Sequence, residues 1–276
     1  RDFCLSRGLG DVYKRQIQNL DFELPQGSCL GVVGPNGVGK SSLLRVLAGL
    51  DDPASGSVVV SGTVAYLPQD VNLKSDLNVL EVVLLGRARY LKWYQQPNSL
   101  DRKEAEKWLQ VMSIEHLAQS SFMTLSGGQK QLVLIAQALT SECDLLILDE
   151  PSSALDLQNQ EKLFAILNEL QETDSLTIIF STHDPNQAYH FCDQLTMLGF
   201  GQQQHGRCKD VMTSQSLKEV YKVNFEEIKC SNNDLKYFLH VPRNFVRSLL
   251  QLSLIHISEP TRQAEMSYAG FGLKKK

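Results

Sequence analysis

The sequence predicts an α/β fold: a largely parallel β-sheet with a helical subdomain inserted into it. Short apolar runs alternate with segments of helical periodicity, a pattern typical of parallel strands connected by helices. Between Leu77 and Leu125 the strand signal disappears and helical patterns dominate. We therefore expect the inserted helical subdomain to occupy about residues 77–140.

Each expected strand is a short apolar run, and each expected helix has apolar residues on one face. Asp184 before Pro185 is a good helix N-cap followed by proline at the first helical position. Beyond Val211 the pattern is weak, and we expect short helices that pack on the core. The expected strands are Cys29–Val33, Val58–Val60, Thr63–Tyr66, Leu145–Leu148, Leu176–Ser181 and Leu195–Leu198. The expected helices are Lys40–Ala48, Val79–Ala88, Asp101–Met112, Gly127–Thr140, Leu157–Leu170 and Pro185–Cys192.

Composition excludes several classes of protein. With 276 residues, 42% of them hydrophobic and 21% charged, the chain has the composition of a globular protein. A net charge of −4 without a basic stripe argues against a nucleic-acid partner. The six cysteines show no CxxC spacing, so we expect neither a disulfide framework nor a zinc site. The compartment that we expect is the reducing cytosol. No apolar run approaches the ~20 residues that span a bilayer, so any membrane crossing falls to a separate subunit.

Both ends of the chain are set apart from the rest. Residues Cys4–Gln16 and Ser253–Lys276 each resemble translated read-through of a sequencing adapter, and segments of that kind are excluded from fold reasoning. We therefore expect residues 1–16 and 253–276 to be non-native and residues 17–252 to form the domain. The alternative is that these ends are flexible natural tails.

A phosphate-binding loop is predicted at residues 34–41. Gly34, Pro35, Asn36, Gly37, Val38, Gly39, Lys40 and Ser41 fit the pattern GxxxxGK[ST], after an apolar strand and before a helix. Glycines let successive backbone N–H groups surround anionic oxygens, and a helix N-terminus adds partial positive charge. Lys40 can then reach the terminal phosphates, the Ser41 hydroxyl can ligate Mg²⁺, and Ser42 belongs to the same ATP-binding set. The alternative is a glycine-rich turn that binds nothing.

Two carboxylates end the apolar strand Leu145–Leu148. In a parallel sheet, acids at the carboxyl end of a strand lie beside the phosphate loop. Asp149 therefore suits Mg²⁺, directly or through water, and Glu150 is placed to orient or deprotonate an attacking water. Alone, such a pair would more often be a solvated strand end; together with the phosphate loop it indicates a hydrolytic site.

Leu125 and the four residues after it resemble the signature motif of the ATP-binding cassette (ABC) ATPase family, a branch of the P-loop NTPases. Further motifs follow the family order: Gln69 in AYLPQ resembles the Q-loop glutamine, and His183 in FSTHD resembles the switch histidine. The resemblance covers residues 17 to about 223. The signature residues are Ser126, Gly127, Gly128 and Gln129, and those that resemble the D-loop are Ser153, Ala154, Leu155 and Asp156.

The family resemblance implies a dimer and a catalytic set. Two copies pair head to tail, and ATP lies between the phosphate loop of one copy and the signature segment of the other. Glu150, His183 and Gln69 are then the catalytic residues, with His183 against the γ-phosphate. ATP and Mg²⁺ are the implied cofactors, and Ser41, Gln69 and Asp149 are the implied metal-binding residues. An aromatic residue that stacks on adenine is usual upstream, but that region coincides with the adapter-like stretch, so none is assigned.

Two further resemblances indicate an importer. Residues Val79–Arg87 resemble the segment after the Q-loop in importers of metal chelates such as iron complexes, haem and cobalamin, and of molybdate. Residues Ser141–Gln160 look like the molybdate and tungstate members of that branch. This implies permease subunits as partners, an indirect link to a substrate-binding protein, and a peripheral position on the cytoplasmic face of the bacterial inner membrane.

Two other classes stay open as alternatives. One is a soluble ABC ATPase of DNA repair or translation, and the other is the cassette of an exporter. Residues 42–125 are too few to hold the long coiled coil of many repair ATPases. Membrane helices or a second cassette in the same reading frame would favour one of these alternatives.

Overall fold

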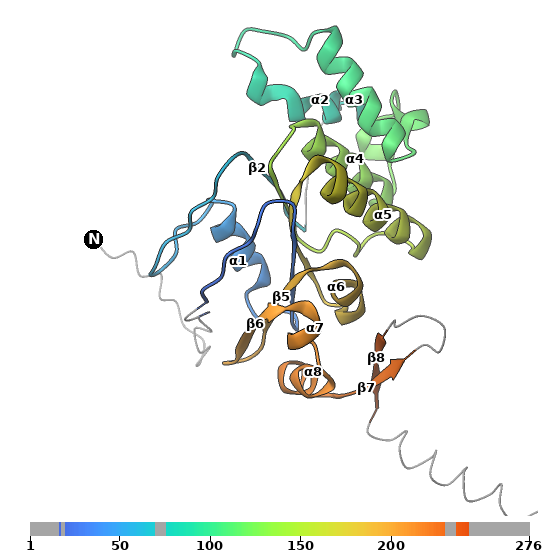
Figure 1. Cartoon of the computed structure of the whole chain (residues 1–276). Helices are drawn as coiled ribbons and strands as arrows, with labels where there is room; N and C mark the ends of the chain where they lie inside the picture. The colour runs from blue at the N-terminus through green and yellow to red at the C-terminus, as the bar shows by residue number, and fades with distance from the viewer. Residues whose placement is uncertain (1–16, 18–19, 70–75, 230–235, 243–276) are drawn as a thin grey trace, which may run out of the picture.

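The computed structural model describes residues 17, 20–69, 76–229 and 236–242. Within these residues an open sheet is covered by helices, and a group of helices projects beyond one edge of it (Figure 1). No helix in this part of the chain is both long and apolar enough to cross a bilayer. The expectations for residues 1–16 and 253–276 lie outside the described residues and stay predictions.

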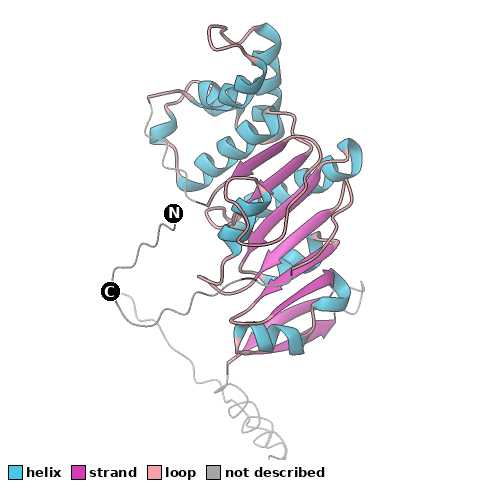
Figure 2. Cartoon of the chain, turned by 90° about the vertical axis from the view of Figure 1, so that its left-hand side faces the viewer, coloured by secondary structure: helices cyan, strands magenta, loops and turns pink. Residues whose placement is uncertain are grey.

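The main sheet has six strands in the order β2-β3-β4-β1-β5-β6. Figure 2 shows the strands of the chain in magenta, with helices beside them. All neighbouring pairs are parallel except β5 and β6, which are antiparallel. The prediction of a mainly parallel α/β sheet is therefore confirmed. The strands are β1 Cys29–Val33, β2 Val64–Leu67, β3 Leu145–Leu148, β4 Thr177–Thr182, β5 Gln194–Leu198 and β6 Gln203–Arg207.

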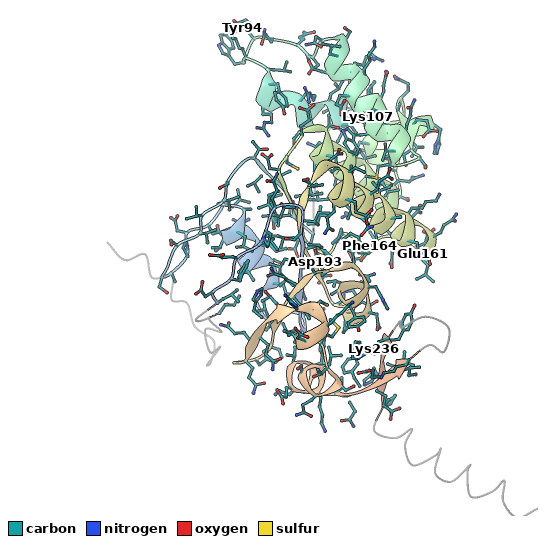
Figure 3. All side chains as sticks on the ribbon, viewed as in Figure 1. Tyr94, Lys107, Glu161, Phe164, Asp193 and Lys236 are labelled. Atoms are coloured by element: carbon teal, nitrogen blue, oxygen red, sulfur yellow. The ribbon has the colours of Figure 1, made fainter. Side chains whose placement is uncertain are left out.

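Alternating side chains of the buried strands enter two different cores, because successive residues of a strand point to opposite faces. On one face, Leu30 and Ile147 pack with Leu44 of α1 (Lys40–Leu47). On the other, Leu146 and Phe180 pack with α5 (Leu157–Asp174) and with the inserted helices. Phe164 of α5, labelled in Figure 3, has its ring centroid 5.4 Å from that of Phe180. Both faces are thus apolar, as a parallel sheet requires.

The chain between β2 and β3 forms only helices in the residues described there, as the sequence predicts. Two of them begin with reciprocal capping boxes: Asn78 with Glu81, and Asn98 with Asp101. In Figure 1 these helices form the green lobe at the top. They are α2 Val79–Leu84, η1 Leu85–Tyr90, α3 Ser99–Val111, η2 Glu115–Leu117, η3 Phe122–Thr124 and α4 Gly127–Thr140.

One expected strand is absent, and the expectation of short helices after Val211 holds only for α8 (Ser214–Tyr221). Val58–Val60 is not a strand, and Val59 is 89% exposed, because no neighbouring strand among the described residues supplies the hydrogen bonds that a strand needs. After β6, the chain forms α7 (Cys208–Val211) and α8 (Ser214–Tyr221), and then a hairpin of β7 (Asn224–Lys229) and β8 (Lys236–Val241) in place of further helices. The hairpin depends on tertiary contacts, since Phe238 of β8 is buried in the core.

Arg87 ties the inserted helices together. Its guanidinium donates to Asp101 of α3 at 3.0 Å, to the Thr140 carbonyl at the end of α4 at 3.2 Å, and to Glu142 at 2.8 Å. The side chains of Arg87 and Asp101 are 13% and 5% exposed. A hydrogen bond from the Asn98 backbone, together with this guanidinium, holds the pKa of Asp101 below its usual value despite burial. Removing Arg87 would leave the Asp101 carboxylate buried without a cationic partner.

Arg87→Ala should lower the free energy of unfolding by about 3 kcal/mol, because a buried carboxylate loses its partner. Arg102→Ala removes an exposed pair with Glu106 and should cost less than about 1 kcal/mol. Since the pKa of Asp101 is lowered on folding, its stabilisation is present above the ordinary pKa and is lost as pH falls through the lowered one. Urea titrations should therefore show the Arg87→Ala deficit at neutral pH and a smaller one below about pH 4. Equal deficits in the two variants would contradict this account.

Candidate functional site

The strand order gathers the predicted site residues at one edge of the sheet. Strands β2, β3, β4 and β1 are neighbours and run parallel, so their carboxyl ends lie side by side. Gln69 follows β2, Asp149 and Glu150 follow β3, His183 follows β4, and the phosphate loop follows β1. In parallel α/β sheets this edge is where ligands bind.

The phosphate loop is a backbone cradle at the start of α1. Gly37 and Gly39 have φ values of 75° and 109°, in the region that glycine tolerates best. A Cβ at Gly34 would collide with the carbonyl oxygen of Leu198, so the loop passes too close to β5 for any side chain. The Val38 side chain is buried in the core, which leaves only its backbone N–H for a ligand. Ser41 and Ser42 are exposed in the first turn of α1, where the N–H groups of a helix are unpaired.

Asp149 and Glu150 are held by Ser181, which sequence analysis placed in a strand without a role at the site. The Ser181 hydroxyl donates to Asp149 Oδ1 at 2.5 Å and accepts from the backbone N–H of Glu150 at 2.9 Å. All three residues are buried. One sequence signal could have indicated a role for Ser181, namely its position as a polar residue at the end of a buried strand. Glu150 itself has a φ of 49°, which costs of order 1–3 kcal/mol for a residue with a side chain and is typical of functional sites.

Three predicted residues converge on the Glu150 carboxylate. Lys40 Nζ lies 3.4 Å from Oε1, Gln69 Nε2 donates to Oε2 at 3.2 Å, and His183 Nδ1 lies 3.5 Å from the same Oε2. Lys40 also donates to the carbonyl of Gly34 at 2.9 Å, which places its ammonium inside the loop. Lys40 and Glu150 are buried, whereas the His183 side chain is 61% exposed. The family resemblance grouped Gln69, Glu150 and His183 as one catalytic set, and the structure brings these three residues and Lys40 into contact.

The predicted D-loop and signature segments meet each other instead of the phosphate loop. Ser126 caps α4 in a capping box with Gln129, as the sequence predicts. A Cβ on Gly128 would lie 3.0 Å from the carbonyl oxygen of Ala154, so this glycine permits a close approach to the D-loop. Ser126 and Gly127 are exposed, and α4 stands with the inserted helices, away from α1 (Figure 1).

A polar network that sequence analysis missed joins the D-loop to the residues after His183. Gln187 of α6 (Pro185–Phe191) accepts hydrogen bonds from Ser152 and Thr182, both at 2.9 Å, and donates to Gln160 at 3.0 Å. Gln160 in turn donates to the carbonyls of Ser152 and Leu155. Nothing in their spacing revealed these glutamines, because they lie on two different helices. The network makes the D-loop and the His183 segment one connected unit.

The oxygen donors at this edge fit a hard divalent cation that is shared with a phosphate. The described residues hold no cluster of three or more acidic, histidine or cysteine side chains that could bind a metal alone. Mg²⁺ is usually bound by one or two carboxylates and substrate phosphates instead of a protein cage. Asp149 supplies one buried carboxylate. The pKa of the neighbouring Tyr66 is raised first by burial of the phenol and second by the negative charge of Asp149. The Ser41 hydroxyl and the Gln69 amide are donors of the right type.

Comparison with known proteins agrees with this geometry. The sequence profile of the ABC transporter family matches residues 17–153. The molybdate import ATP-binding protein MolC of Haemophilus influenzae is 35% identical over 235 residues, which cover 84% of this chain and 92% of that protein. The chain belongs to the ATP-binding proteins of the ABC transporter family. As a member it binds ATP and is an ATPase, so the predicted fold and activity are confirmed.

Two solved structures extend the comparison. One is a transporter assigned to the metal-chelate type, in an inward-facing conformation, with a TM-score of 0.77 and 34% identity over 82% of this chain and 91% of that one. The other is a dimeric ATP-binding cassette bound to ADP and Pi in a post-hydrolysis state, with a TM-score of 0.63 and 28% identity over 69% of this chain and 89% of that one. Cassettes of this family thus form dimers and belong to transporter complexes.

Ser181→Ala should disturb both acidic residues at once. The Glu150 N–H would lose its acceptor in a buried position, which should cost about 1–3 kcal/mol of unfolding free energy. The displaced carboxylates should also lower ATP turnover by about tenfold. Chemical denaturation and a phosphate-release assay would measure the two effects. Ser99→Ala, at an exposed position in α3, is the control and should change neither. Unchanged turnover in Ser181→Ala would contradict the role assigned to this hydroxyl.

Proposed function

We propose that this chain hydrolyses MgATP to power import of a metal chelate or an oxyanion such as molybdate through a separate permease. The observation that carries the catalytic part is the contact of Lys40, Gln69 and His183 with one buried carboxylate, Glu150. The relatives carry the importer part, since they include a molybdate import protein and a transporter assigned to the metal-chelate type.

In the proposed mechanism the phosphate loop binds the triphosphate through its backbone N–H groups and Lys40. Lys40 now shares its charge between the Gly34 carbonyl and Glu150, so phosphate binding would draw it from the carboxylate. Glu150 is then free to accept a proton from the attacking water. His183 contacts the γ-phosphate. Gln69 couples the nucleotide site to the inserted helices. Mg²⁺, held by Ser41, Asp149 and Gln69, would neutralise charge that develops on the phosphate oxygens.

The site is completed by a second copy in this proposal. At the exposed N-terminus of α4, the N–H groups of Gly127 and Gly128 have no hydrogen-bond partner among the described residues and are suited to a phosphate. It stands apart from the phosphate loop of its own chain (Figure 1), which is what a head-to-tail dimer requires. ATP between two copies would close the dimer, and hydrolysis would reopen it.

A groove beside the inserted helices is the proposed permease contact. It has a volume of about 670 Å³ and lies between the edge strand β2, η1 and α4. Leu85 and Arg89 line one wall, and Tyr66 and Leu67 line the other, only two residues before Gln69. A permease segment seated there would touch the same loop that contacts Glu150. The subunit would then sit on the cytoplasmic face of the bacterial membrane, held there by its permease.

Glu150→Gln should lower ATP turnover at least about a hundredfold, because an amide cannot accept the proton. ATP affinity should be retained, and ATP should promote a stable dimer. Phosphate release, nucleotide binding and light scattering after size exclusion would measure the three quantities. The control is Glu161→Gln on the exposed side of α5, labelled in Figure 3, which should match the parent protein. Parent-like turnover in Glu150→Gln would refute the assigned base.

Gly127→Asp, introduced into the Glu150→Gln protein, should abolish the ATP-dependent dimer and leave ATP binding intact. The position has room for a side chain in the single chain, since the nearest atom to a Cβ there is Ala154 Cβ at 3.9 Å. A carboxylate would repel the partner's phosphate. Ser99→Asp places the same charge at the exposed start of α3 and should leave dimerisation unchanged. A dimer that survives Gly127→Asp would argue against the head-to-tail arrangement.

A further inference from the structure

The C-terminal unit, defined here as α8, β7 and β8, packs behind the phosphate loop. Leu217 and Val220 of α8 and Phe238 of β8 are buried in one cluster. That cluster also holds Val33, the last residue of β1 before the phosphate loop. Figure 1 shows the unit in orange and red below α6, so it lies against the helix that follows His183. The unit is therefore in contact with two segments of the proposed site.

The first link runs through Tyr221, the last residue of α8. Its hydroxyl donates to the backbone carbonyl of His183 at 3.3 Å. The ring is half-buried and contacts Phe225 with a centroid distance of 5.7 Å. Burial raises the pKa of Tyr221 well above its usual value, against a backbone hydrogen bond from Gly34 that lowers it. The hydroxyl therefore keeps its proton and remains a donor, within reach of both the phosphate loop and the His183 segment.

The second link runs through Asn186, in the first turn of α6. Its side-chain amide donates to the carbonyl of Phe238 at 3.1 Å and accepts from the backbone N–H of the same residue at 2.7 Å. An amide that pairs with both polar groups of one residue imitates a neighbouring strand and fixes β8 to α6. Antiparallel pairing holds β7 and β8 together, and Lys236 Nζ, on the residue labelled in Figure 3, lies 2.9 Å from Glu227 Oε1 across the two strands.

These links matter because the His183 side chain has little other support. It is 61% exposed, and its ring has one contact with a charged group in the described part of the chain, Glu150 Oε2 at 3.5 Å. The direction of the imidazole is thus set mainly by the backbone from Thr182 to Asn186. Tyr221 holds that backbone at one point, and Asn186 holds it three residues later.

We infer that Tyr221 and Asn186 are positioning residues, through which the C-terminal unit fixes the backbone of His183 and so sets the rate of ATP hydrolysis. Neither side chain needs to touch ATP. The inference rests on the role proposed above for His183. It assigns to the C-terminal unit a task beyond packing, since a small displacement of α8 or β8 would reach the hydrolytic site directly.

Tyr221→Phe tests the inference, because it keeps the ring and removes only the hydroxyl. We expect kcat for ATP to fall about fivefold, the equivalent of one lost hydrogen bond, while KM stays within about twofold. The midpoint of thermal unfolding should stay within about 3 °C of the parent value. Asn186→Ala should show the same division between kcat and KM. The matched control is Tyr189→Phe on α6, whose ring packs on Phe238 and whose hydroxyl has no contact with His183; it should keep parent-like kinetics.

The outcomes separate this inference from the proposed function. Parent-like kcat in Tyr221→Phe would overturn the inference, and so would a loss of activity explained by a large fall in unfolding temperature. His183→Ala is measured in parallel. If His183→Ala is inactive while Tyr221→Phe is normal, only the inference fails. If His183→Ala turns over normally, the proposed role of His183 fails, and the inference fails with it.

Discussion

The buried contact between Lys40 and Glu150 is the interaction on which the rest of the site depends. A buried ammonium or carboxylate is tolerated only when it is paired, so each of these residues needs the other and its hydrogen-bonding neighbours. Each lies beside a turn with positive φ values: Glu150 itself has a left-handed backbone, and Lys40 begins α1 directly after the glycines of the phosphate loop. Gln69 and His183 complete the same cluster from two further loops. One carboxylate therefore connects four segments that are far apart in the sequence.

Hydrogen bonds and close packing connect the Glu150 cluster to the surfaces where partners would bind. Ser181 fixes the two acids from β4, and the network of Gln160 and Gln187 joins the D-loop to the segment after His183. The signature glycine Gly128 in turn packs against the D-loop. A second copy that contacts the D-loop or the start of α4 would thus act on elements that already touch the proposed catalytic residues.

The inserted helices are also connected to the Glu150 carboxylate. Arg87 joins η1 to α3 and α4 with buried, charge-assisted hydrogen bonds. These bonds stabilise the packing of the helices within the lobe. The lobe follows β2 and Gln69 in the sequence, and Gln69 contacts Glu150. A permease segment that displaces the groove beside Leu85 would therefore also displace the contacts of the Glu150 carboxylate. The C-terminal unit reaches the centre from the opposite side, through Tyr221.

Periodicity and short motifs were enough to predict the sheet type, most of the helices and strands, and ATP hydrolysis. Apolar runs marked β1, β3 and β4, and the pattern from Gly34 to Ser41 marked the phosphate loop, because these signals are local and depend on periodicity and glycine spacing. Three other features arise from packing: Val58–Val60 has no strand partner among the described residues, β7 pairs with β8 in a hairpin, and Ser181 and Gln187 lie at the site. Those outcomes depend on what lies beside each segment in space, and contacts between distant residues leave no periodic trace in a single sequence.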